Sequence, residues 1–134
     1  SNSVSDDLNQ EIEHLLITPN NKSLLVVDAN SVMYQYKTDD RALEINHGEI
    51  HRGKTRAISV TRDGMFLFSC CNLGGLRQFS FTQRKVLKTW SPFERHDETG
   101  HELPLEGFNC MTMAPGRLIA GDSTGKILEI SVLD

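Results

Sequence analysis

Five histidines and a group of acidic residues are the side chains that most directly suggest chemistry. His47 and His51 lie close together in the sequence, and His96 and His101 share one segment with three acidic residues. Zinc requires ligands that converge tetrahedrally from fixed elements, and a long hydrophilic loop does not hold its histidines in that way. We therefore predict no metal site and no cofactor, and we interpret His51 as a structural residue.

The cysteines do not form a recognisable reactive motif. Cys70 and Cys71 are adjacent, Cys110 stands apart, and no Cys-x-x-Cys spacing occurs. This odd set argues against a disulfide framework and favours a reducing, intracellular compartment, cytoplasmic or nuclear. No histidine stands beside the cysteine pair, which we interpret as small apolar core residues. Residues 121–126 have the residue types of a phosphate-binding loop at the wrong spacing and are typical of a turn.

The composition is that of an ordinary soluble domain. The chain has 134 residues, of which 38% are hydrophobic and 24% are charged. The net charge of −4 argues against a nucleic-acid or anionic-membrane partner, which would normally require a basic surface. No apolar run is long enough to cross a bilayer, so we expect no membrane association.

A β-hairpin pattern recurs along the chain. An alternating apolar strand in segment 57–69 leads into Asp63-Gly64 and then into a second strand, which is a strong hairpin signal. The pattern also occurs 43 residues earlier, around the turn at 18–22, and 52 residues later, around Pro115-Gly116. Pro-Gly suits the central pair of a type II turn, and we expect this third turn to be one residue shorter.

Each copy continues with further strands. A third strand follows at 32–36, 76–81 and 127–132, and the first two copies add a fourth at 42–45 and 86–90. The unit is therefore four short antiparallel strands in about 43 residues, a period typical of a propeller blade. No stretch holds apolar residues at helical spacing over three turns, so the predicted fold class is all-β.

The second copy resembles the WD-repeat family of β-propellers. Gly48 and His51 stand for the family's Gly-His pair, His51 precedes Asp63 by twelve residues, and Phe79 lies where the family has its Trp. The resemblance implies structural roles for His51, Asp63 and Phe79. Leu73 replaces the structural Asp expected between the second and third strands, so the buried His–Asp network of the family is not expected in this blade.

The resemblance implies a partial propeller of three antiparallel four-stranded blades, of which the last lacks its outer strand. The segment 91–107 is longer than a connection between blades needs, which is typical of an insertion or of a binding loop. The expected divisions are an N-terminal arm or edge-completing segment at 1–12, a first blade at 13–50, a second blade at 51–108 with its long exit loop at 91–107, and an incomplete third blade at 109–134.

Three blades leave two uncovered apolar faces, because propellers close into rings of four to eight blades. Three arrangements would cover these faces. The chain is a fragment of a longer propeller, two copies associate as a homodimer that closes a six-bladed ring, or residues 4–12 fold back over an edge. The sequence does not choose between them.

The resemblance implies a non-enzymatic scaffold that binds a protein or peptide, with self-assembly as an alternative and a small-ligand or enzymatic site in the channel as a minor one. Partners of such propellers dock where the first strands begin and where the second strands turn into the third. Arg56 and Phe108 are the expected hot spots, because Arg and aromatic residues contribute most at interfaces. The expected contact residues are Glu11, Glu13 and Ala29 in the first blade, Lys54, Arg56 and Asn72 in the second, and Glu106, Phe108 and Ser123 in the third.

Overall fold

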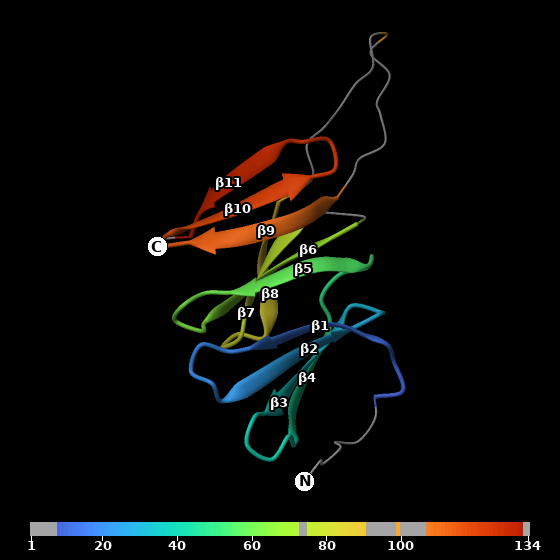
Figure 1. Cartoon of the computed structure of the whole chain (residues 1–134), viewed down its shortest axis with the longest axis vertical. Helices are drawn as coiled ribbons and strands as arrows, with labels where there is room; N and C mark the ends of the chain where they lie inside the picture. The colour runs from blue at the N-terminus through green and yellow to red at the C-terminus, as the bar shows by residue number, and fades with distance from the viewer. Residues whose placement is uncertain (1–7, 73–74, 91–98, 100–106, 133–134) are drawn as a thin grey trace.

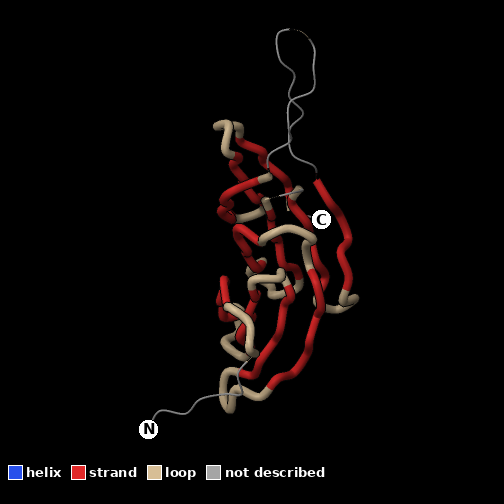
Figure 2. The backbone as a smooth tube through the Cα atoms, turned by 90° about the vertical axis from the view of Figure 1, so that its right-hand side faces the viewer, coloured by secondary structure: helices blue, strands red, loops and turns tan. Residues whose placement is uncertain are grey.

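The structure is a computed structural model that describes residues 8–72, 75–90, 99 and 107–132. The described chain forms three antiparallel sheets of four, four and three strands, which stack side by side as three blades (Figure 1). Only strands, turns and loops occur in the described ranges, as the tube in Figure 2 shows. The all-β prediction, with a last blade that lacks its outer strand, is confirmed.

Each blade is a meander in which consecutive strands pair. The first blade comprises β1 (Ile12–Ile17), β2 (Ser23–Asp28), β3 (Val32–Lys37) and β4 (Leu43–Glu49). The second comprises β5 (Thr55–Val60), β6 (Phe66–Cys71), β7 (Leu76–Ser80) and β8 (Lys85–Trp90). The third comprises β9 (Phe108–Ala114), β10 (Arg117–Asp122) and β11 (Ile127–Ser131), so it begins one residue before the expected boundary.

Local turn chemistry explains the hairpin between the first two strands of each blade. In the second blade the Asp63 carboxylate accepts hydrogen bonds from the Thr61 hydroxyl at 2.6 Å and from the Met65 N–H at 2.9 Å. Gly64 takes φ +74°, a backbone region that glycine occupies without steric cost. Gly116 has φ +76° in the third blade, which fits the second central position of a type II turn.

The third turn is shorter than the sequence pattern indicated. In the second blade Val60 pairs with Leu67 across the turn, leaving six residues between them. The matching pair of the third blade, Met113 and Leu118, leaves only four. The turn is therefore two residues shorter, not one. Equivalent residues of the second and third blades lie 53 apart before this turn, rather than the expected 52, and 51 apart after it.

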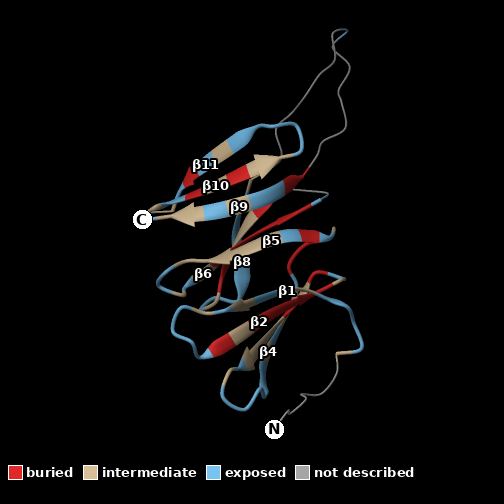
Figure 3. Ribbon diagram, in the orientation of Figure 1, coloured by how far each residue is buried: buried red, intermediate tan, exposed pale blue. Residues whose placement is uncertain are grey.

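The hydrophobic core lies between the blades. We call the interface of the first and second blades the first seam, and that of the second and third blades the second seam. Leu25, Met33 and Phe79 are buried in the first seam, and Phe68 and Phe108 in the second. The central blade is thus covered on both faces. Figure 3 shows buried residues concentrated in second strands such as β2, whereas outer strands such as β8 are largely exposed.

Candidate partner-docking site

The innermost strands of the three blades share one irregularity. β1, β5 and β9 lie side by side in Figure 1, and β5 contacts both of the others. Each has a β-bulge near its first residue, where the pairing register skips Glu13, Arg56 and Asn109, respectively. A bulge leaves its extra residue unpaired and re-aims its side chain, and bulges are frequent beside functional sites. The three blades therefore present one bulge residue each at the same end of the sheets.

The bulges correct one predicted contact residue. Phe108 is fully buried in the second seam, whereas Asn109 beside it is exposed. The assumed spacing of 52 residues placed Phe108 level with Arg56, but the observed spacing of 53 places Asn109 there. A slip of one residue moves a strand side chain to the opposite face of the sheet. Phe108 is thus a buried core residue, and Asn109 is the exposed residue at the position level with Arg56.

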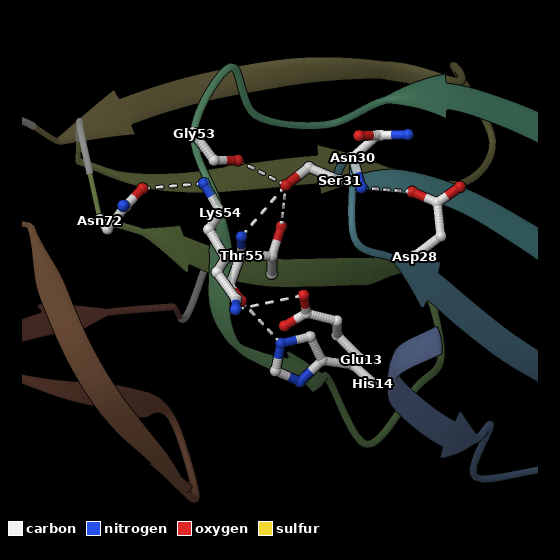
Figure 4. A network of polar contacts seen from close by, with 9 residues as sticks. All are labelled: Glu13, His14, Asp28, Asn30, Ser31, Gly53, Lys54, Thr55 and Asn72. Atoms are coloured by element: carbon white, nitrogen blue, oxygen red, sulfur yellow. Dashed lines mark hydrogen bonds and ion pairs between the residues drawn. The ribbon is translucent and has the colours of Figure 1, made fainter. Parts of the chain in front are cut away.

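A buried polar cluster joins the first two blades at this end of the first seam (Figure 4). Ser31, in the turn between β2 and β3, is fully buried, and its hydroxyl donates to the Gly53 carbonyl at 2.5 Å. The same oxygen accepts hydrogen bonds from the Thr55 N–H at 3.0 Å and the Thr55 hydroxyl at 2.8 Å. The Ile50 N–H donates to the Ser31 carbonyl at 2.9 Å. Ser31 therefore fixes the segment that leads from β4 into β5.

We expect Ser31→Ala to destabilise the fold by about 2 kcal/mol, because the Thr55 N–H and the Gly53 carbonyl would lose a buried partner. Urea unfolding of both proteins measures this difference. Ser123→Ala is the matched control, since Ser123 is an exposed turn residue of the third blade. Equal losses in the two variants would show that the buried cluster does not stabilise the seam.

Two further contacts hold the first blade against the start of β5. The Lys54 ammonium lies 3.3 Å from the Glu13 carboxylate, and the His14 Nε2–H donates to the Thr55 carbonyl at 2.8 Å (Figure 4). Asn72 fixes Lys54 from within the second blade, because its side-chain oxygen accepts the Lys54 N–H at 2.8 Å. Three predicted contact residues, Glu13, Lys54 and Asn72, are thereby brought together.

A shallow hollow of about 400 Å³ lies at the same end of the first seam. Arg52 and Lys54 line it from the second blade, and Asn30 and Glu49 from the first. Arg52 and Arg56 are exposed, and within the described part of the chain neither guanidinium makes an ion pair or a hydrogen bond. Both therefore remain available to an anionic group. We call Arg52, Lys54, Arg56, Asn72 and Asn109 the docking surface.

The other predicted contact residues are more dispersed. Glu11 is exposed, and its backbone carbonyl accepts the Ala29 N–H at 2.7 Å, so these two lie beside the docking surface. Ser123 is exposed on the third blade. Glu106 and Leu73 lie outside the described residues, as does nearly all of the loop 91–107. Arg52 was not predicted from the sequence as a contact residue, because it precedes Lys54, the first repeat position considered in this blade. The usable signal was an arginine placed just before a predicted strand.

The residues predicted to be structural have well-defined surroundings. His51 is buried, and its Nε2 lies 2.7 Å from the Ser69 hydroxyl on β6. Burial and, to a lesser extent, the charge of Arg77 lower the pKa of His51 to about 4, while hydrogen bonding with Ser69 acts in the opposite direction. Phe79 is buried in the first seam and meets Phe81 edge-on. The imidazole of His51 is therefore neutral at physiological pH.

The described residues offer little for catalysis. Burial raises the pKa of the Cys70 thiol to about 12, so this sulfur stays protonated at neutral pH and is a poor nucleophile. No group of three or more metal-binding side chains occurs within the described ranges. No described helix is long and apolar enough to span a membrane.

Comparison with known proteins yields structural relatives alone. No family model and no curated protein sequence matches the chain. The WD40 repeats of RRP9 superpose with a TM-score of 0.72 at 12% identity, covering 95% of this chain and 37% of that one. The fold is a partial β-propeller. The computationally designed Ika4 protein superposes with a TM-score of 0.66 at 10% identity, covering 92% of this chain and 67% of the designed one.

The coverage of each structural neighbour shows how much of its chain the three blades match. The chain spans about one third of the RRP9 repeats and about two thirds of Ika4. At such low identity the likeness concerns the fold, and it carries no information on binding.

Proposed function

We propose that this partial propeller is a non-enzymatic scaffold that binds a protein or peptide segment at the docking surface. The observation that carries the proposal is the bulge at Arg56, which presents an exposed guanidinium that has no partner among the described residues. Arg56 lies two residues after Lys54, which lines the hollow of the first seam. Arginine is enriched among interface hot spots and binds carboxylates through two parallel hydrogen bonds. Arg52, which lines that hollow, offers a second exposed guanidinium four residues earlier in the chain.

The charge arrangement favours an acidic segment as the partner. Lys54 is already paired with Glu13, so its charge is largely compensated within the chain. Arg52 and Arg56 are not compensated in this way. A carboxylate bound at either guanidinium would make charge-assisted hydrogen bonds, whereas a lysine side chain in the same place would be repelled.

We expect Arg56→Glu to weaken binding of an acidic peptide by about 2 kcal/mol, or roughly thirtyfold, because the change replaces attraction by repulsion. Peptides selected from a displayed library against the native protein provide the ligands, and fluorescence polarisation gives the dissociation constants. Arg62→Glu is the matched control, since Arg62 is exposed in the turn at the other end of β5. Equal weakening by both variants would reveal general electrostatic attraction and would contradict a docking site at Arg56.

A further inference from the structure

One face of the first blade is left uncovered by the rest of the described chain. Ile17 pairs with Leu24, and Leu24 with Tyr36, so these side chains share one side of the sheet. Leu15 is 62% exposed on that side and Ile17 is 57% exposed. The open face of the first blade therefore comprises Leu15, Ile17, Leu24, Tyr36 and Leu43. It is apolar, in contrast to the solvent face of an ordinary sheet.

The same repeat positions are buried in the other two blades. Leu24 corresponds to Leu67 in the second blade and to Leu118 in the third, and both of these are fully buried. Tyr36 corresponds to Phe79, which is 4% exposed in the first seam. In the second and third blades these positions pack against the preceding blade. The first blade thus has the composition of a blade that receives another blade in front of it.

The third blade carries the complementary face. Ile127 is 71% exposed, although its counterpart Leu76 in the second blade is fully buried in the second seam. Ile119 corresponds in the same way to Phe68, and exposed Cys110 lies on the same side as both isoleucines. We call Cys110, Ile119 and Ile127 the open face of the third blade. These positions pack against the following blade elsewhere in the chain. The exposed ion pair of Arg117 and Glu129, 3.1 Å apart, lies on the same side of the sheet.

We propose that a second copy of this chain covers both faces, so that two chains close a six-bladed ring. The open face of the first blade receives the open face of the third blade of the other copy, in the way that each internal seam joins consecutive blades. Two such contacts related by a twofold axis cover the two open faces of each copy. This self-association is separate from docking, because it uses the ends of the blade stack.

The closing seam would rest on packing of the apolar side chains of the two open faces, without the buried hydroxyl cluster of the first seam. In the first seam Ser31 and Thr55 form the buried polar cluster. By the repeat register, Gly125 of the third blade and Ile12 of the first blade stand at these two places. Neither side chain can reproduce the hydroxyl contacts. A charge placed at Ile17 or Ile127 would therefore be desolvated without the hydroxyl partners that the first seam has, and would be costly.

Sedimentation equilibrium of the full chain at micromolar concentration tests the proposal. We expect a species with twice the chain mass of 15.1 kDa. Ile17→Glu and Ile127→Glu should each raise the dissociation constant about a hundredfold or more, since each places a carboxylate in the closing seams. Both residues are exposed in a single chain, so circular dichroism should show an unchanged fold. Met65→Glu is the matched control, because Met65 is an exposed apolar residue on neither open face.

Mixing the two variants identifies the contact. One of the two closing seams is intact in a mixed pair of Ile17→Glu and Ile127→Glu chains, so a mixture should dimerise more strongly than either variant alone. A monomeric native chain would overturn the proposal and would indicate that another segment covers the faces. A dimer that survives Ile127→Glu but not Ile17→Glu would also overturn it, because the first blades would then pair with each other. Open-ended larger oligomers would exclude ring closure.

Discussion

Acidification from pH 7 to pH 4 should lower the free energy of unfolding by about 3 kcal/mol through His51 alone. The pKa of this imidazole is about 4 in the folded chain, against 6.5 in the unfolded chain, because it is buried and lies near Arg77. Between these values the unfolded chain binds a proton that the folded chain does not. The stabilisation is therefore complete above pH 6.5 and is lost as the pH falls towards 4.

Urea unfolding at several pH values measures this loss, and His51→Gln is the variant that isolates it. The Gln amide can still form a hydrogen bond with the Ser69 hydroxyl, but it does not titrate. We expect a much flatter pH dependence of stability in the variant. A small slope should remain, because burial also lowers the pKa of His47. If the variant loses stability with acid as steeply as the native chain, another group dominates the acid response.

The hairpins could be predicted from the sequence because their determinants are local. Asp63 and Gly64 fix their turn through hydrogen bonds within five residues and through one positive φ. Strand alternation then assigns the two flanking strands, as the pairing of β5 with β6 shows. Such signals depend on neighbouring residues alone, so one sequence suffices to find them.

The docking surface was predicted only in part, because its remaining determinants are not local. Ser31 meets Thr55 across 24 residues and across two blades, and no sequence pattern indicates that contact. The availability of Arg52 likewise depends on which carboxylates the fold brings near it. Turn length was the third obstacle, since one residue of error moved the predicted contact from Asn109 to Phe108. The Pro115-Gly116 pair was a usable signal, because two-residue hairpin loops are common.

Phe108→Ala should destabilise the chain by about 3 to 5 kcal/mol, the range for removing a large aromatic side chain from a core. Phe108 is fully buried in the second seam, where it packs in the cluster that contains Phe68 and Leu118. Asn109→Ala should change stability by less than about 0.5 kcal/mol, because Asn109 is an exposed residue that the β9–β10 pairing skips. Urea unfolding of the two neighbouring variants measures both values.

Binding separates the two residues in the opposite direction. At a temperature at which the Phe108→Ala chain is still folded, its affinity for a selected acidic peptide should match that of the native chain, because Phe108 cannot reach a docked partner. Asn109→Ala should weaken the same peptide if the partner extends from Arg56 on β5 to the neighbouring bulge on β9. If Phe108→Ala instead remained stable but no longer bound the peptide, Phe108 rather than Asn109 would be the contact residue, as the spacing of 52 residues predicted. The length of one turn thus decides whether the third blade contributes a polar side chain or an aromatic one to the docking surface.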